Sequence, residues 1–537
     1  MDVLHHREVI DVTDTHKEIG IAIGETTSTE FLFVADEEVT KWEYISVKST
    51  EKVDGKNVEV EVLGQIHTVC SQSMALREGI DLVSAEKIIQ AGLADSKIFA
   101  KTRILGFIYE GSVYQPRRAI QPGKKVYIAD EKILKEFYSS MEDEGLYIGH
   151  LITRDSVPIY IDVNGFRRHL AILAQTGAGK SYTTGVLIEE LLKKGATIVV
   201  IDPHADYVFM SKKKSGVTVD EVDIFRTLDS IGRYSEGEIG KKVNTYEVKF
   251  SDLDTDDIMT ICGINKGWVK IETAIENAIK SLPDYYDLDD LIDMLERGKA
   301  EKLNKDINPS AALRYVRRLK RLKVFGAATT NVDKFLKPKH LSVLDLSGLD
   351  DRVSDYVAYG VLNAIYDRLT SRVYKYPVFL IIEEAHRFIP VQDKTLSRDI
   401  IKKIAAEGRK FGVFMTLITQ RPSKIDPDAL SQCNSQIIMR ITNPDDQNAI
   451  RKSSERISES LLNDLPGLNV GEAVVVGHLV KTPIMVRIRK RETKEGGGDI
   501  NILSLLKDAL EEAEIKNKNR TEDIKKEIDG YIRMMEI

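Results

Sequence analysis

The sequence predicts an α/β protein in which a mainly parallel sheet with a helical insertion follows an N-terminal all-β barrel. Continuous apolar runs typical of buried parallel strands recur in the second part of the chain, among them Ala196–Asp202 and Tyr376–Ile382. Before residue 135, short β-forming runs alternate with polar turns, as in a small barrel. These N-terminal strands are expected at Gly20–Ile23, Glu30–Val34, Trp42–Val47, Val58–Leu63, Arg103–Tyr109 and Lys125–Ala129.

Length and charge limit the class of protein. A chain of 537 residues exceeds what one hydrophobic core supports. We expect a barrel at 1–135, a core at 136–490 with a helical insertion at about 252–339, and a helical arm at 491–537. The net charge of −7 excludes a globally basic nucleic-acid coat, but not a ring whose positive charge is confined to its lumen. Without an apolar run of about 20 residues or a signal-peptide pattern, we expect a cytoplasmic protein with no membrane partner.

A glycine-bearing loop joins the apolar strand Leu170–Leu173 to a helix, which is the context of a phosphate-binding P-loop. Gly177 and Gly179 let successive N–H groups point inward at a helix N-terminus, forming an anion site. Lys180 is expected to contact the β- and γ-phosphates, and the Ser181 hydroxyl to ligate Mg²⁺. The chain is therefore predicted to bind a nucleoside triphosphate. The predicted binding residues are Gln175, Thr176, Gly177, Ala178, Gly179, Lys180, Ser181 and Tyr182.

The apolar strand Tyr376–Ile382 ends in two carboxylates, an arrangement typical of nucleotide hydrolases. Glu383 is expected to orient Mg²⁺ through water. Glu384 is expected to take a proton from the attacking water, because a carboxylate engaged with the metal is a poor base. The alternative is a buried strand that merely ends in acidic surface residues.

Further polar residues are predicted at the ends of neighbouring strands. Gln420 follows the apolar strand Val413–Thr419 and is placed to sense the γ-phosphate or to position water. The segment Asp202–Asp206 ends another apolar strand at the same edge. Arg409 is a candidate arginine finger supplied by a neighbouring subunit. It fits equally well a surface arginine near a helix C-terminus.

Two charged segments remain. Lys212, Lys213 and Lys214 form a basic run that is usually a solvated loop, with nucleic-acid contact as the alternative. Arg489–Gly498 is predicted to be a flexible breaker. After it, the charged amphipathic pattern from Ile500 to Met535 predicts a helical arm that packs on a neighbour or on its own core.

Taken in order, five motifs and the preceding barrel resemble HerA, a family of hexameric DNA translocases in the HerA/FtsK branch of ATPases. The resemblance extends to about Arg489 and implies a RecA-like P-loop ATPase core. It also implies ATP held between subunits with Mg²⁺, and a homo-hexameric ring around double-stranded DNA. The motifs are Thr176–Ser181, Asp202–Tyr207, Ile382–His386, Glu407–Gly412 and Thr419–Ser423.

The resemblance also assigns roles to individual residues. Lys180, Ser181, Glu383 and Glu384 match the nucleotide and metal positions of the family, and Gln420 matches its polar sensor. Arginines that act on the neighbouring subunit's nucleotide are implied at Arg409 and Arg168. The family works with the nuclease NurA in resecting DNA ends.

The predicted function is an ATP-dependent DNA translocase or helicase that acts with a NurA-type nuclease in double-strand-break end resection and recombinational repair. One alternative is a DNA-pumping ATPase of the conjugation or packaging type, and a membrane anchor would favour the conjugation pump. Another alternative is a nucleotide-dependent scaffold that does not translocate. The scaffold predicts ATP turnover that is indifferent to DNA.

Overall fold

The computed structural model describes residues 17–138, 144–230, 232, 234–265, 267–300, 307–496 and 502–535. The chain divides into two compact units, Met1–Lys494 and Glu495–Ile537. Within the described ranges, every helix is too short or too polar to cross a membrane.

An antiparallel barrel forms the N-terminal part of the first unit. Its strands follow the order β1–β2–β5–β4–β3–β7, and β7 pairs back with β1 to close the barrel. Alternate side chains, including Phe31, Phe33, Ile45 and Val47, point into its core. The predicted all-β barrel is confirmed. Its strands are β1 Glu18–Ile23, β2 Glu30–Ala35, β3 Tyr44–Val53, β4 Lys56–Gln72, β5 Lys97–Tyr109 and β7 Lys125–Ile128, with β6 Ser112–Tyr114 beside β5 and helix α1 Leu82–Gln90 between β4 and β5.

The core contains a 12-stranded sheet, in the order β13-β12-β16-β11-β17-β18-β10-β19-β20-β21-β8-β9. Pairing is parallel from β13 to β19 and antiparallel from β19 to β9, which confirms the predicted mainly parallel sheet. The strands are β8 Leu146–Leu151, β9 Arg154–Ile161, β10 Leu170–Leu173, β11 Thr197–Asp202, β12 Val222–Arg226, β13 Asn244–Thr245, β16 His340–Asp345, β17 Val378–Ile382, β18 Val413–Thr419, β19 Ser435–Ile438, β20 Glu472–Val476 and β21 Ile484–Ile488.

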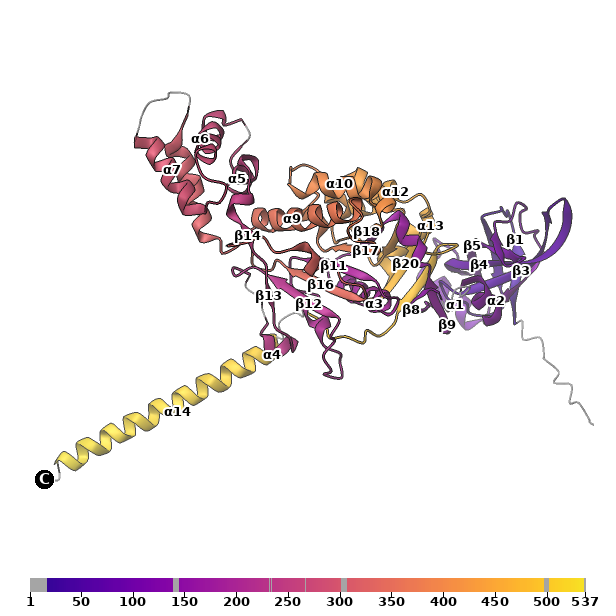
Figure 1. Cartoon of the computed structure of the whole chain (residues 1–537). Coiled ribbons are helices and arrows are strands. Elements are labelled where there is room, and N and C mark those ends of the chain that lie inside the picture. Colours follow the sequence, from indigo (N-terminus) through magenta and orange to yellow (C-terminus); the bar gives the residue numbers. More distant parts are fainter. Residues whose placement is uncertain are drawn as a thin grey trace, which may run out of the picture. The chain divides into compact units, whose positions relative to one another are not determined.

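Helices cover both faces of the parallel strands (Figure 1). On β11, Val199 and Ile201 belong to the hydrophobic core that contains α9 (Asp351–Thr370) and α10 (Ser397–Glu407). Ile198 and Val200 belong instead to the core that contains α3 (Lys180–Lys193). A strand buried on both faces has no polar side, which explains its continuous apolar sequence.

The described residues of the predicted insertion form four helices, which pack into the core shared with α9 through Ile258, Ile275, Leu291 and Leu313. The short parallel pair β14 (Val248–Lys249) and β15 (Phe325–Gly326) brackets them. The predicted division of the chain into domains stays a prediction. The four helices are α5 Thr255–Ile261, α6 Val269–Lys280, α7 Leu288–Ala300 and α8 Pro309–Val316.

A polar network with a buried centre joins the barrel to the core. The guanidinium of Arg103 on β5 donates to Asp464 Oδ2 at 2.9 Å and to Gln65 Oε1 at 2.7 Å. Lys41 pairs with the other oxygen of Asp464 at 2.8 Å. Arg103 and Asp464 are both buried, so each is held by the other's charge.

The remaining helices of this unit are α2 Glu131–Tyr138, α4 Glu236–Ile239, α11 Pro427–Gln432, α12 Pro444–Ser453 and α13 Glu459–Asp464.

The C-terminal part differs from the sequence prediction in one respect. Arg489, Arg491 and Thr493 are buried against α3, so the predicted flexible breaker is wrong for its first half. The charged sequence of this segment indicates an exposed loop. The structure instead buries these charged side chains against partners elsewhere in the chain. The second unit contains α14, Ile502–Met535, a single helix whose residues Leu503, Leu506 and Leu510 are exposed.

Candidate nucleotide site

Three neighbouring strands end at one edge of the sheet, and each is followed by predicted site residues. The strands β17, β18 and β10 are adjacent and parallel, with Leu173 opposite Thr419 and Ile382 opposite Leu417. The phosphate loop, the two glutamates and Gln420 therefore meet outside the carboxyl ends of these strands. Ligands bind at this position in open α/β sheets.

The loop after β10 has the backbone that an anion site needs. Gly177 and Gly179 have φ values of 77° and 102°, which residues with a Cβ atom rarely adopt. The α3 helix begins at Lys180, so its free N–H groups face the loop. Gln175 secures the loop, because its N–H donates to the Arg440 carbonyl at 2.9 Å and its side chain accepts from Thr442 at 3.0 Å.

The Lys180 ammonium lies between the two glutamates that follow β17. It donates to Glu383 Oε1 and, at 2.9 Å, to Glu384 Oε1. Burial disfavours the charged amine, but the two carboxylates outweigh burial and raise the pKa of Lys180. The lysine is therefore a fixed positive charge beside the loop.

Glu383 is completely buried, and both of its oxygens have partners. Oε1 accepts from Lys180, and Oε2 accepts from the Tyr207 hydroxyl at 2.5 Å. Burial raises the pKa of Glu383, against the opposing effect of Lys180. Tyr207 was not among the predicted site residues, although it lies in the turn that follows β11.

Glu384 is linked to the end of β18. Gln420 Nε2 donates to Glu384 Oε1 at 2.8 Å, and the Thr176 hydroxyl of the phosphate loop donates to Gln420 Oε1. The other oxygen, Glu384 Oε2, is buried without a hydrogen bond, and His386 Nδ1 lies 3.2 Å from it. Burial lowers the pKa of His386, which favours its neutral form. Glu384 thus retains one acceptor oxygen without a hydrogen-bonded proton.

Ser181 contacts a carboxylate that was given no role from the sequence. Its hydroxyl donates to Asp206 Oδ2 at 2.8 Å. Buried Asp202 shapes this turn by accepting from the backbone N–H groups of Asp206 at 3.1 Å and Tyr207 at 2.9 Å. Asp206 was expected at this edge, but the contact with Ser181 depends on the turn, which spacing along the sequence does not reveal.

Arg168 and Arg409 lie at the amino ends of the strands, on the side of the sheet opposite the phosphate loop. Arg168 ends the turn before β10, and Arg409 lies in the turn before β18, so both precede the strands whose far ends carry the site. Both are exposed. At about 3.3 Å per residue, the length of β18 separates Arg409 from Gln420 by about 20 Å. Neither arginine reaches the phosphate loop of its own chain.

The remaining predicted residues make contacts within the chain. The Tyr182 hydroxyl accepts from the Arg491 N–H at 2.7 Å, so its side chain faces away from the phosphate loop. Lys212 donates to the Gly237 carbonyl at 2.8 Å, and the Lys214 ammonium lies 5.4 Å from the centre of the Tyr182 ring. Lys213 is exposed. The nucleic-acid contact predicted for these lysines stays a prediction.

Sequence comparison shows the family. The profile described as "Helicase HerA, central domain" matches residues 146–365. The "Probable helicase MJ1565" of Methanocaldococcus jannaschii is 31% identical over 96% of this chain and 99% of its own length. The "Probable DNA double-strand break repair helicase HerA" of the same organism is 32% identical over 90% of this chain and 97% of its own. The chain belongs to the HerA helicase family.

Membership of the HerA family identifies the chain as a P-loop ATPase and confirms the predicted family. A further relative, the "DNA double-strand break repair helicase HerA" of Pyrococcus furiosus, is 31% identical over 76% of this chain and 82% of its own. Among solved structures, VirB4 of Thermoanaerobacter pseudethanolicus is 16% identical, with a TM-score of 0.46 over 65% of this chain and 97% of its own.

Proposed function

We propose that this protein is an ATP-driven motor that moves along double-stranded DNA and unwinds it. It acts as a homo-hexameric ring, with a NurA-type nuclease, in the resection of double-strand breaks. The relatives from Methanocaldococcus jannaschii and Pyrococcus furiosus that are named as double-strand-break repair helicases support this proposal. So does the site, which gathers a phosphate loop, two glutamates and an amide at one sheet edge.

Each side chain has a task in the hydrolysis step. When the nucleotide binds, phosphate oxygens replace Glu383 and Glu384 as partners of the Lys180 ammonium. Glu384 accepts a proton from water as the water oxygen attacks the γ-phosphorus and the bond to the bridging oxygen of ADP breaks. Gln420, which is hydrogen-bonded to Glu384, keeps the carboxylate and the water aligned.

The donor set at the loop fits Mg²⁺. Hydroxyl and carboxylate oxygens are the ligands that Mg²⁺ takes, and it keeps several waters and substrate phosphates as well. The Ser181 hydroxyl and Asp206 Oδ2, which lie 2.8 Å apart, would hold the ion. Glu383 would orient it through a water molecule. When bound, the ion neutralises phosphate charge. Within the described ranges, no group of three or more His, Cys, Asp or Glu side chains is arranged to hold a metal ion.

The placement of the two arginines carries the proposal of a ring. Lys180 and Glu384 lie at one edge of the sheet, whereas Arg168 and Arg409 are exposed at the other. In a head-to-tail ring, the arginine edge of one subunit faces the phosphate-loop edge of the next. A guanidinium from the neighbour would then stabilise the charge that develops on the γ-phosphate during hydrolysis.

The decisive experiment measures ATP turnover with and without duplex DNA, on protein whose mass is determined by light scattering. We expect a hexamer and a turnover that rises when DNA is added. The stimulation should fall steeply with salt, because contacts to phosphates release counterions. A monomer would contradict the ring, and a hexamer with the same turnover in both conditions would indicate the non-translocating scaffold.

The nuclease partnership needs its own test. We expect a NurA-type nuclease to co-elute with the hexamer in gel filtration, and ATP to increase its degradation of blunt duplex ends. The Glu384→Gln variant is the matched control, because it should bind the nuclease and fail to drive degradation. Normal degradation with this variant would separate the nuclease from the motor.

A further inference from the structure

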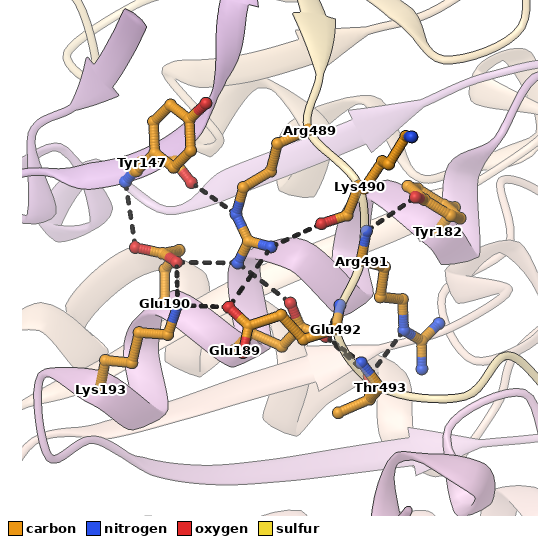
Figure 2. Close-up of polar contacts among 10 residues, drawn as sticks. All are labelled: Tyr147, Tyr182, Glu189, Glu190, Lys193, Arg489, Lys490, Arg491, Glu492 and Thr493. Carbon is orange, nitrogen blue, oxygen red and sulfur yellow. Dashed lines mark hydrogen bonds and ion pairs between the residues drawn. The ribbon is translucent and has the colours of Figure 1, made fainter. Parts of the chain in front are cut away.

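The segment that leaves the sheet after β21 lies along the helix that carries the phosphate-loop lysine. We call residues 489–494 the strap. Arg489, Arg491 and Thr493 of the strap are 8%, 3% and 6% exposed. Figure 2 shows the strap beside α3, with Tyr182, Glu189, Glu190 and Lys193 of that helix facing it. The strap is thus a packed part of the core.

Glu189 of α3 holds the backbone of the strap. Its Oε1 accepts from the N–H groups of Glu492 at 2.9 Å and Thr493 at 2.8 Å, and from the Thr493 hydroxyl at 2.8 Å. Glu189 is only 5% exposed, so these bonds form away from water. A buried carboxylate that accepts several hydrogen bonds fixes its donors, because an unpaired buried charge is costly.

Arg489 adds a second attachment to α3 (Figure 2). Its guanidinium lies 3.0 Å from Glu189 Oε2 and 2.8 Å from Glu190 Oε1. It also donates to the carbonyls of Tyr147 at 3.2 Å and Lys490 at 2.8 Å. The ion pair therefore has hydrogen-bond partners on both sides, the condition under which a buried pair holds two elements together.

The third attachment explains a glycine in the middle of α3. Glycine is unfavourable inside a helix relative to alanine. At Gly185, however, an added Cβ would lie 2.6 Å from Arg491 Cζ, so the guanidinium occupies the space of a side chain. The Arg491 N–H also donates to the Tyr182 hydroxyl at 2.7 Å. Tyr182 directly follows Ser181, so this contact is in the first turn of the helix.

The strap also pairs with the basic run on its other side. Lys213 forms a β-bridge with Thr493, the Lys214 N–H donates to the Glu492 carbonyl at 2.8 Å, and the Lys494 N–H donates to the Lys212 carbonyl at 2.8 Å. The strap therefore lies between α3 and this run and is held from both sides.

We propose that the strap is a positioning element for the phosphate loop, and that Arg491, seated on Gly185 and Tyr182, sets the first turn of α3. This inference rests on the proposed function in one respect, namely that the loop binds ATP. Lys180 and Ser181 belong to that turn, whereas Glu384 and Gln420 follow the ends of β17 and β18. The attachments of the strap described above go to α3, Tyr147 and the basic run. Loosening the strap therefore weakens ATP binding and raises KM, and leaves kcat nearly unchanged.

The test is a double-mutant cycle with Gly185→Ala, Arg491→Ala and the pair of changes together. In Gly185→Ala the new Cβ displaces Arg491, and we expect the ATP dissociation constant and KM to rise about tenfold. Arg491→Ala should raise both by a similar factor. The double variant should be no weaker than Arg491→Ala, because the clash is gone and alanine favours the helix. In all three, kcat should stay within about twofold.

Gly360→Ala is the matched control. Gly360 lies inside α9, and an added Cβ would meet only the Tyr246 hydroxyl at an ordinary 3.6 Å. We expect wild-type ATP binding from it. Hydrogen exchange at residues 180–186 gives a second readout, and it should accelerate in Arg491→Ala even if Gly185→Ala fails to fold.

Two failures are distinguishable. If the wild-type protein does not bind ATP, the proposed function fails before the strap is tested. If the wild-type protein binds ATP and Arg491→Ala binds it equally well, with unchanged exchange at 180–186, only the strap proposal is overturned. A double variant that binds ATP about tenfold more weakly than Arg491→Ala would also overturn it, because the added Cβ would then weaken binding without the clash with Arg491.

Discussion

Gln420 Nε2 donates a 2.8 Å hydrogen bond to Glu384 Oε1, and this bond joins the ends of two adjacent parallel strands. The amide is itself held by Thr176 of the phosphate loop. The loop, the proposed base and the proposed sensor are therefore connected side chain to side chain. A change at the γ-phosphate would therefore reach β18 through these hydrogen bonds.

Glu384→Gln should abolish hydrolysis without abolishing binding. The amide keeps an acceptor oxygen for Lys180 and Gln420 but cannot take a proton. We expect kcat to fall by about 10²–10⁴-fold, the usual contribution of a positioned base, and the ATP dissociation constant to change little. Single-turnover hydrolysis and fluorescent-nucleotide titration measure the two quantities. Turnover within a few fold of wild type would assign the base elsewhere.

Asp206→Asn should weaken nucleotide binding only when Mg²⁺ is present. Asparagine keeps an oxygen near Ser181 but removes the negative charge that attracts the ion. We expect the affinity for ATP to fall about 10–100-fold in Mg²⁺, as for other partners of metal ligands, and to be unchanged in EDTA. Equal losses in both conditions would mean that Asp206 shapes the loop instead. Exposed Asp220→Asn, near the other end of the connection between β11 and β12, serves as the control.

Most of the fold and half of the site follow from local sequence. The parallel strands are predictable because strands buried on both faces have continuous apolar sequences. Lys180, Glu384 and Gln420 are predictable as well, because each follows such a strand or the loop after it. The contact between Ser181 and Asp206 depends on a turn stabilised by Asp202, and no spacing rule encodes it.

The strap was missed for a different reason. Its arginines and lysines predict a solvated segment, because the sequence alone does not show whether a charged side chain has a buried partner. The partners of Arg489 are Glu189 and Glu190, about 300 residues earlier in the chain. A glycine inside the predicted helix, at Gly185, was the available signal that another element approaches closely.

Arg409 should act on the ATP of a neighbouring subunit. Arg409→Ala and Lys180→Ala should each be inactive, since the first lacks the finger and the second lacks the phosphate contact. When the two are unfolded together and reassembled, about one quarter of the ring interfaces combine an intact Arg409 with an intact Lys180. We expect ATP turnover to reappear in the mixture. A mixture as inactive as its components, in hexamers shown by mass to contain both, would contradict action between subunits.

Buried His169 should make the core less stable in mild acid. It lies between Arg168 and β10, has a φ of 53°, and accepts from the Met415 N–H through Nδ1 at 3.0 Å. Burial lowers the pKa of His169 to about 4 from its ordinary 6.5. The folded state therefore resists protonation that the unfolded state accepts, so the stabilisation is complete above pH 6.5 and is lost as the pH falls toward 4. Between pH 8 and pH 5 the loss is about 2 kcal/mol.

His169→Asn tests this dependence with little change to the backbone. Asparagine tolerates a positive φ, and its side-chain oxygen replaces the acceptor for Met415, yet it does not titrate. Urea unfolding at pH 8 and pH 5 should show a smaller loss of stability in the variant than in wild type, by about 2 kcal/mol. Exposed His204→Asn should keep the wild-type difference. If His169→Asn loses as much stability as wild type between these pH values, protonation of another group unfolds the core.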